Sequence, residues 1–380
     1  MGLTKNDESK AYSGYTLFST EGDFYAYLID IEGRVVQRWE MPYTPGQYGE
    51  LLPNGNILFL GRTDTALAPG EDVAGRGIGG YSGILIEIDW SGNLVWQYKE
   101  NYMHHSFYRK KNGNTLILRW FGPMPSEIAR KIHKNISTDQ CNKNHEVWST
   151  GIQEISSAGN VVWEWRDYDH LDPEIDRIGP KDACNDWMHA NKVEELANGN
   201  ILMCARNLNS IYIINRKSGH VEWRWGSGEL ANPHDATSLD NGNILIFDNG
   251  MYRAGSEICY SRVVEVNPKT SKVEWEYLGD PLTAFYSSIQ SGCQRLLNGN
   301  TLVTESTQGR LFEVTREKEI VWEFINPFYA YYLNPGWSNM IFKAFRYEPG
   351  FEGLRDRELE ADKFKWINRA KGLDKITSVH

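Results

Sequence analysis

The chain has 380 residues, of which 41% are hydrophobic and 13% aromatic, enough to bury a sizeable core. Its net charge of −10 argues against nucleic acid or an anionic membrane as a partner held by bulk attraction. Five cysteines without a CxxC pair argue against a disulfide framework or a structural zinc site. The polar N-terminus and the absence of a long apolar run predict a soluble, cytoplasmic protein.

Two strand signals alternate along the chain after residues 1–12, which we expect to be disordered, and a first strand near Tyr15. One signal is a run of β-forming residues that crosses a turn and ends in tryptophan, at Trp39, Trp96, Trp163, Trp223, Trp275 and Trp322. The other is an Asn-Gly-Asn turn between apolar strands, starting at Asn54, Asn112, Asn198, Asn241 and Asn298. Asn-Gly between alternating apolar residues is a strong hairpin signal.

The two hairpins together supply about four strands at a period of roughly 50 residues, which is typical of a propeller blade. The sixth blade has no Asn-Gly-Asn hairpin after Trp322, and the strand near Tyr15 is well placed to complete it. We therefore predict an all-β, six-bladed β-propeller over residues 13–345, closed across the termini. The repeated tryptophans are expected to pack between neighbouring blades.

Several segments interrupt this pattern. The Gly-rich stretch 68–83 is expected to be a long rim loop, a candidate lid, and residues 121–147 contain a short candidate helix. Residues 166–188 form a second rim insertion, rich in Asp and Pro. The aromatic stretch 328–347 is expected to dock on the propeller. The C-terminal extension 346–380 is expected to carry a charged, exposed helix over 355–370.

Polar residues stand at matched positions around the Asn-Gly-Asn turns. His234 lies seven residues before Asn241, and Asp248 and Asn249 lie seven and eight after it, so they should lie opposite each other in the hairpin. The other hairpins place Gln47, His104, His105, Asn191 and Ser291 before the turn and Arg62, Arg119, Arg206, Glu305 and Ser306 after it, with His189 two residues further out. In a propeller these ends face one mouth of the channel, which predicts a concave polar site.

The residue types indicate the chemistry of this site. Guanidinium groups from three blades would bind an oxyanion through bidentate hydrogen bonds and would repel a bare metal cation. Histidines beside them can act as nucleophile, acid or base near neutral pH. The combination suits transfer of a sulfuryl or phosphoryl group. For Arg62 and Arg119, a salt bridge to Glu305 or Asp248 is an equally good interpretation.

The run DWMHANKVEELANGNILMCARNLNSIYIINRKSGHVEWRWG at 186–226, followed by PHDATSLDNGNILIFDNG, resembles the signature region of bacterial arylsulfate sulfotransferases. The resemblance implies a six-bladed propeller that moves a sulfuryl group from a phenolic sulfate to a phenol through a sulfohistidine. It implies that His234 is the nucleophile and that His189 and Arg206 hold the sulfate oxygens. His105, in preference to His104, would supply the remaining contact with the sulfate group.

Around these residues we expect His104, Arg62, Arg119, Asn191, Asp248 and Asn249 to contact a small anionic, aromatic-sulfate-like substrate, without a metal or cofactor. Two other functions stay open from the sequence. One is a lyase or hydrolase of a small anionic metabolite, with a metal held by His105, His189 and His234. The other is a non-catalytic propeller that serves as an interaction platform. A homo-oligomer is compatible with either.

Overall fold

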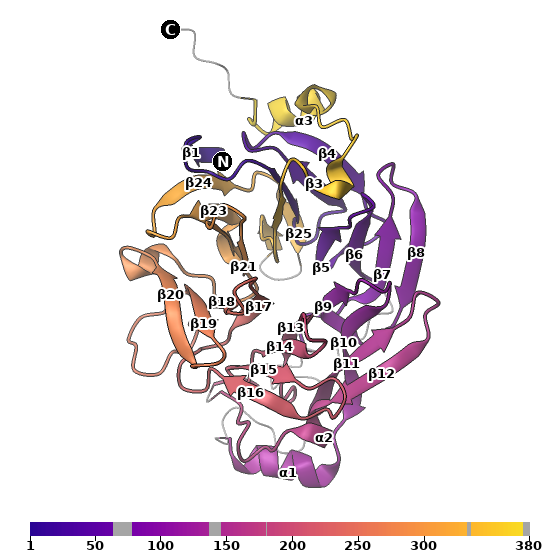
Figure 1. Ribbon diagram of the computed structural model, residues 1–380, viewed down its shortest axis with the longest axis vertical. Coiled ribbons are helices and arrows are strands. Elements are labelled where there is room, and N and C mark those ends of the chain that lie inside the picture. The colour runs from indigo at the N-terminus through magenta and orange to yellow at the C-terminus, as the bar shows by residue number, and fades with distance from the viewer. Residues whose placement is uncertain (64–77, 137–145, 180, 333–335, 375–380) are drawn as a thin grey trace. The chain divides into compact units, whose positions relative to one another are not determined.

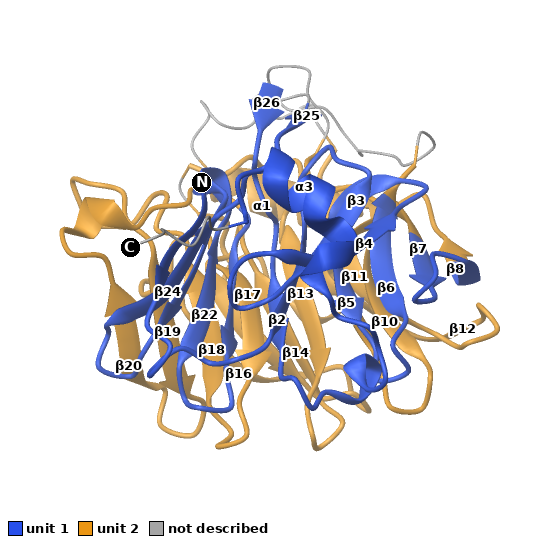
Figure 2. Cartoon of the chain, turned by 90° about the horizontal axis from the view of Figure 1, so that it is seen from above, with its two compact units in different colours: residues 1–61, 85–97, 290–380 blue, residues 62–84, 98–289 orange. Residues whose placement is uncertain are grey.

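The chain folds as a six-bladed β-propeller. The structure, a computed structural model, describes residues 1–63, 78–136, 146–179, 181–332 and 336–374. Within these residues the strands form six antiparallel sheets of four or five strands and one two-stranded hairpin. The residues group into two units, coloured separately in Figure 2. Unit 1 comprises residues 1–61, 85–97 and 290–380, and unit 2 comprises residues 62–84 and 98–289.

Unit 2 contains three complete blades, whose strands follow one another in chain order (Figure 1). Their strands are β9 (Met103–Arg109), β10 (Thr115–Pro123), β11 (Trp148–Ile155) and β12 (Val161–Arg166); β13 (Ala190–Glu195), β14 (Ile201–Ala205), β15 (Ser210–Ile214) and β16 (Val221–Trp225); β17 (His234–Ser238), β18 (Ile244–Asp248), β19 (Arg262–Asn267) and β20 (Lys272–Leu278). Buried apolar side chains pack between neighbouring blades, as where Leu118 and Trp165 join Met203 and Tyr212 in one cluster. This packing fixes the ends of β9, β13 and β17 relative to one another.

Unit 1 contains two complete blades and most of a third. Their strands are β2 (Tyr15–Ser19), β3 (Tyr25–Ile29), β4 (Val35–Glu40) and β27 (Phe345–Tyr347); β21 (Gly292–Arg295), β22 (Thr301–Glu305), β23 (Arg310–Val314), β24 (Ile320–Ile325) and β1 (Gly2–Asn6); and, for the partial blade, β5 (Thr44–Leu51), β6 (Ile57–Arg62), β7 (Gly83–Ile88) and β8 (Leu94–Lys99). The predicted closure across the termini is confirmed, because β2 pairs with β27. The blade predicted for β2 is wrong, however, since β2 lies in the blade of Trp39, and the blade of Trp322 contains the Asn-Gly-Asn hairpin at Asn298.

The closing blade is held by a buried ion pair. Arg346 on β27 pairs with Glu313 on β23, and both side chains are fully buried. The Arg346 Nε also donates to Thr16 Oγ1 at 3.0 Å, and its guanidinium lies 4.1 Å from the Trp322 ring centroid. Residues near the two ends of the polypeptide therefore share one polar contact. The expected disorder of residues 1–12 is wrong, because β1 pairs with β24 from Gly2 to Asn6.

The Asn-Gly-Asn turns are built alike in all five predicted hairpins. In each, the first Asn side chain accepts a hydrogen bond of 3.0 Å from the backbone N–H of the second. The central residue, such as Gly242 with a φ of 84°, lies in the left-handed region that only glycine adopts without strain. In four of the hairpins the second Asn also bonds a glutamate on the adjacent strand, as Asn243 does with Glu265 at 2.8 Å. These bonds fix the register that sets which side chains reach the far end of each hairpin.

The predicted packing of tryptophans between blades is seen at Trp163 and Trp223, which lie against clusters shared by two blades, but only half of the six are buried. Trp39, Trp275 and Trp322 are buried, and Trp322 donates to the Ile31 carbonyl at 2.8 Å, which links two blades of unit 1. The expected tryptophans of three other blades, Trp96, Trp163 and Trp223, are only half-buried. In two of them Trp165 and Trp225 take the buried position instead. The side chains two residues apart share a strand face, and the second of them lies deeper in the blade.

The insertions follow the predicted boundaries only in part. Helix α1 (Ser126–Lys134) confirms the helix expected within 121–147, and α2 (Asp167–His170) opens the 166–188 segment (Figure 1). The C-terminal helix α3 (Lys365–Ala370) is shorter than expected. It is also not simply exposed, since Ile367 and Asn368 are buried and Asn368 Oδ1 accepts from the Val35 N–H at 2.9 Å. Most of the candidate lid 68–83 lies outside the described residues.

None of the helices in the described part of the chain has both the length and the apolar character that crossing a bilayer requires.

Candidate functional site

Three neighbouring inner strands of unit 2 begin with the histidines that the hairpin register singled out. Each of β9, β13 and β17 has a register shift near its start, which is the mark of a β-bulge. At two of these bulges His105 and Asp235 have φ values of 53° and 52°, and His189, just before β13, has a φ of 45°, all in the left-handed region. A bulge re-aims side chains, and non-glycine residues in this region cost about 1–3 kcal/mol each and concentrate at functional sites.

His234 has a well-defined side-chain partner. Its Nδ1 lies 2.7 Å from Asn249 Oδ1, and the Asn249 amide donates to the Ser287 carbonyl at 2.8 Å. That second bond turns the Asn249 oxygen toward the imidazole, so Nδ1 must carry the proton and donate it. The lone pair of the neutral ring therefore sits on Nε2. The backbone register places His234 opposite Phe247 and not opposite Asn249 as predicted, but the side chains of His234 and Asn249 do meet across the hairpin.

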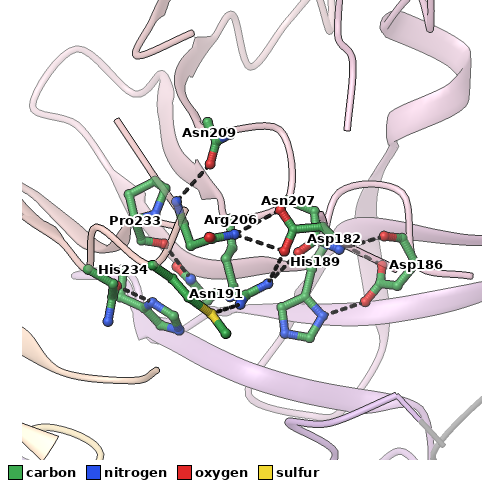
Figure 3. A network of polar contacts seen from close by, with 12 residues as sticks. Asp182, Asp186, His189, Asn191, Arg206, Asn207, Asn209, Pro233 and His234 are labelled. Atoms are coloured by element: carbon green, nitrogen blue, oxygen red, sulfur yellow. Dashed lines mark hydrogen bonds and ion pairs between the residues drawn. The ribbon is translucent and has the colours of Figure 1, made fainter. Parts of the chain in front are cut away.

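Two buried carboxylates hold the other members of the site (Figure 3). Asp186 lies 2.7 Å from His189 Nδ1 through its Oδ2, and its Oδ1 accepts the His189 backbone N–H at 3.1 Å. Asp182 accepts from Arg206 at 3.1 Å and from the Asn232 amide at 2.8 and 2.9 Å. The Arg206 guanidinium also donates to Asn207 Oδ1 at 2.6 Å. Both aspartates come from the 166–188 insertion.

His104 and His105 form a pair behind this network. Their Nδ1 atoms are 2.8 Å apart, and the His104 ring stacks on Trp120 with the centroids 4.1 Å apart. The His105 ring meets the His189 ring edge-on, 4.5 Å between centroids. A Cβ at Gly80 would fall 1.9 Å from the His105 ring, so only glycine allows the described end of the 68–83 loop to lie this close.

Burial keeps these imidazoles neutral. Burial and the Arg206 charge together lower the pKa of His234 to about 3, while hydrogen bonds with Asn249 and the Asn232 backbone oppose the shift. Burial likewise lowers the pKa of His104 to about 3 and takes that of His105 well below its usual value. Two neutral rings that share an Nδ1–Nδ1 contact must be opposite tautomers, one donating and one accepting.

The pKa of Asp186, in contrast, is shifted so that its charged form is favoured. Burial would raise the pKa of its carboxyl, but the charge and hydrogen bond of His189, together with His104, hold the pKa below its ordinary value. The carboxylate is therefore ionised beside His189. His189, His234 and Arg206 all act electrostatically on His105, which places the four side chains within range of one another. We call His105, His189, Arg206 and His234 the His–Arg cluster, and all of it belongs to unit 2.

The remaining predicted residues lie around the cluster with different partners. The Asn191 amide donates to the Pro233 carbonyl at 2.8 Å, just before His234 (Figure 3). The Arg62 guanidinium lies 4.8 Å from the Tyr81 ring, and Tyr81 pairs with His104 through an isolated β-bridge. Asn191 and Arg62 therefore remain at the edge of the site.

Arg119 and Asp248 instead make contacts that turn them away from the cluster. Arg119 pairs with Glu100 at 3.6 Å and covers the Phe121 ring. Asp248 pairs with Arg253 and Arg262 at 2.9 and 2.8 Å. The expectation of three converging guanidiniums is therefore not met, and Arg206 is the arginine inside the cluster. For Arg119 the reason is its ion pair with Glu100. For Asp248 it is strand geometry, since consecutive residues such as Asp248 and Asn249 point to opposite faces.

Sequence reasoning missed Asp182 and Asp186, although both are buried and hold predicted site residues. Among the described residues no three His, Cys, Asp or Glu side chains are grouped so as to hold a metal ion. What the cluster offers is a neutral imidazole with a defined lone pair, an imidazole backed by a carboxylate, and one guanidinium. That set can attack an electrophile that carries oxyanions and can donate hydrogen bonds to those oxygens.

Comparison with solved structures shows the fold. A protein of unknown function from Bacteroides caccae has a TM-score of 0.54 at 13% identity, over 88% of this chain and 98% of that one. A streptogramin B lyase has a TM-score of 0.46 at 13% identity, over 85% and 81%. The hydrazine synthase of Kuenenia stuttgartiensis has a TM-score of 0.47 at 11% identity, over 77% and 71%. No curated protein matches this sequence.

A family model supplies the assignment. The model described as arylsulfotransferase (ASST) matches residues 65–327, more than two thirds of the chain, and that range contains every residue of the His–Arg cluster together with Asp182 and Asp186. The resemblance noted from the sequence is thereby confirmed, and the chain belongs to the arylsulfotransferase (ASST) family.

Proposed function

We propose that this protein transfers a sulfuryl group from a phenolic sulfate to a second phenol, with His234 as the nucleophile. The observation that carries the proposal is the bond from His234 Nδ1 to Asn249 Oδ1, which leaves the lone pair on Nε2 of a buried, neutral ring. Arg206 and His189 act on this ring electrostatically, so cationic donors lie close to the nucleophile. Such a pairing suits attack on an electrophile that carries negative oxygens.

The proposed reaction has two displacements. In the first, His234 Nε2 attacks the sulfur, an N–S bond forms, and the bond from sulfur to the aryl oxygen breaks with its electron pair leaving on the phenolate. In the second, the oxygen of the acceptor phenol attacks the sulfur, and the N–S electron pair returns to Nε2. Arg206 would contact the sulfuryl oxygens through the edge of its guanidinium that is turned away from Asp182.

The His189–Asp186 pair is proposed to manage the proton. Protonated His189 would hold a sulfuryl oxygen and then pass its proton to the departing phenolate. The neutral imidazole would afterwards take the proton of the acceptor phenol. Asp186 supports both steps because its ionised carboxylate orients Nδ1–H and stabilises the charged ring. His105 would complete the contacts of the group being transferred.

The test is to trap the covalent intermediate. Rapid mixing with 4-nitrophenyl sulfate without an acceptor should release a burst of 4-nitrophenol of about one equivalent, and peptide mass spectrometry should find one added SO₃ on His234. Adding phenol should discharge it. His220→Gln, at an exposed turn histidine, is the matched control and should leave the burst unchanged. A burst without modified His234, or turnover that needs donor and acceptor bound together, would contradict the double displacement.

Asp186→Asn is expected to lower kcat by about 10²-fold with a much smaller change in KM, because an amide cannot stabilise a protonated His189. The loss should grow with the basicity of the leaving group: phenyl sulfate should suffer more than 4-nitrophenyl sulfate, whose phenolate needs little help from an acid. A purely structural role for Asp186 predicts equal losses for both donors. Asp169→Asn, an exposed aspartate of α2, is the control.

Two cellular locations are considered for this protein, the cytoplasm and an oxidising compartment. The sequence favours the cytoplasm, where thiols stay reduced. Cys204, Cys259 and Cys293 are outside any disulfide, but Cys184 is disulfide-bonded, which the cysteine pattern did not predict and which is typical of an oxidising compartment. Alkylation of the protein in intact cells, followed by mass spectrometry of the Cys184 peptide, distinguishes the two locations.

A further inference from the structure

A second pocket lies in unit 1, among residues that the His–Arg cluster does not use. Its volume is about 210 Å³. It opens between the blade that contains β3 and β4 and the C-terminal segment that ends in α3. The residues around it are Asp23, Tyr25, Tyr27, Arg38, Phe328, Tyr329, Trp366, Ile367, Ala370 and Lys371. Neither the family match nor the fold assigns a role to these residues, since all of them fall outside the matched range 65–327.

Two cations line this pocket, and among the described residues no carboxylate is hydrogen-bonded to either of them. The Arg38 guanidinium lies over two rings, 4.1 Å from the Tyr25 centroid and 5.3 Å from that of Trp366. The Lys371 ammonium lies 5.3 Å from the Phe328 centroid. Neither head group forms a hydrogen bond or an ion pair with a group that the structure describes. Arg38 is half-buried, so its donors are held in place at the pocket instead of moving through solvent.

The pocket has aromatic walls as well. Tyr27 and Phe328 stack face to face, 3.9 Å apart and within 16° of parallel. Both are buried, whereas Trp366 is 62% exposed and forms the rim. Flat walls of this kind favour an aromatic ring, since stacked and edge-on ring pairs gain more than their buried area alone provides. The wall and the cations are therefore arranged for one ligand that has both a ring and a negative group.

The acidic residue of the pocket is already engaged. Asp23 accepts the Tyr27 hydroxyl and the Phe24 N–H, both at 2.8 Å. Burial raises the pKa of the Asp23 carboxyl, and the charges of Arg38 and Lys371 oppose that rise. Even with Asp23 ionised, the two cations outnumber it among the residues that line the pocket. A neutral aromatic molecule would leave the guanidinium donors unused, and a cation would be repelled by the surplus charge.

We propose that this pocket is a binding site for a small monocyclic aromatic anion, with Arg38 holding the carboxylate, sulfonate or sulfate and the Tyr27–Phe328 pair holding the ring. Drug-sized ligands occupy roughly 300–1,000 Å³. The smaller volume of about 210 Å³ fits a single ring with one substituent. The site does not depend on the proposed sulfuryl transfer, because it shares no residue with the His–Arg cluster.

The experiment measures binding of three fluorinated probes to the full chain by ¹⁹F NMR titration: 4-fluorobenzenesulfonate, neutral fluorobenzene and zwitterionic 4-fluorophenylalanine. The sulfonate is expected to bind saturably and more tightly than the other two. Arg38→Gln should weaken it by on the order of tenfold, since a charge-assisted pair is lost. Trp366→Ala should also weaken sulfonate binding. Because this substitution is at an exposed position, it tests the pocket even if Arg38→Gln fails to fold. Arg369→Gln, an exposed arginine of α3, is the matched control and should bind as the parent protein does.

His234→Ala separates this site from the His–Arg cluster. Sulfonate binding that survives His234→Ala and is weakened by Arg38→Gln supports the pocket, whatever the outcome for sulfuryl transfer. Binding that His234→Ala removes belongs to the other site and overturns the proposal. It is equally overturned if Arg38→Gln has no effect, if fluorobenzene or 4-fluorophenylalanine binds as tightly as the sulfonate, or if no saturable binding is observed.

Discussion

His234→Ala is expected to abolish sulfuryl transfer, with kcat lower by at least about 10³-fold, because the variant has no atom that can carry the group between donor and acceptor. The structure gives the reason for so large an effect. Asn249 fixes the tautomer of His234, and the other imidazoles of the cluster are differently engaged: Nδ1 of His105 by His104, and Nδ1 of His189 by Asp186. In the proposed mechanism His189 transfers the proton and His105 contacts the transferred group, so His234 alone is assigned the attack. The measurement is steady-state transfer from 4-nitrophenyl sulfate to phenol.

Added imidazole provides an internal control for this variant. A small nucleophile that enters the space left by the missing ring should restore part of the activity of His234→Ala and none of that of an unfolded protein. Circular dichroism should show the parent's β-sheet signal. Activity within a few-fold of the parent would reject His234 as the nucleophile and favour direct transfer between the two substrates.

The second large effect is a loss of stability in mild acid. The pKa values of His104 and His234 are about 3 in the folded protein, against an ordinary value of about 6.5 in an unfolded chain. Between these values the unfolded state binds more protons than the folded state, so the free energy of unfolding falls as pH falls. Above about pH 6.5 both states hold neutral rings and the stability is fully present.

At pH 4.5 each of these histidines should cost the folded state roughly 2–3 kcal/mol relative to pH 7.5. Urea unfolding at the two pH values measures the difference. In His104→Gln the difference should shrink by about one histidine's share, whereas the exposed-site variant His220→Gln should behave as the parent protein. Parallel pH curves for the parent and His104→Gln would show that His104 accepts a proton in the folded state at an ordinary pH.

The sequence was sufficient for the architecture because its strongest signals are local. An Asn-Gly-Asn turn such as Asn241 to Asn243 sets strand ends and register without help from distant residues, and each of the five predicted turns joins two strands. The N-terminal strand β1 was missed because GLTKN lacks an apolar alternation, and its pairing with β24 depends on tertiary contact. The buried tryptophans at Trp165 and Trp225 were misplaced by two residues for a related reason. How deeply a side chain lies within a blade depends on tertiary packing and cannot be read from the adjacent residues.

The site was predictable where it follows hairpin register and not where it follows an irregular segment. His105, His189, His234 and Arg206 stand at the ends of regular strands, and the structure brings them together. Asp182 and Asp186 lie in an insertion without periodicity, so nothing in their spacing from a turn placed them beside Arg206 and His189. One signal was available for Asp186, which stands three residues before His189. For Arg119 the register identified the right end of the strand, but its pairing with Glu100 turned the side chain elsewhere.

The way in which the propeller closes has a consequence for biosynthesis. Strands β2 to β4 leave the ribosome before all the propeller strands that follow them, yet β2 pairs with β27 at Phe345–Tyr347, far later in the sequence. Until then the nascent protein must keep one edge of β2 without its partner and Glu313 without its buried guanidinium. The growing chain therefore carries an exposed strand edge until Phe345–Tyr347 has been synthesised.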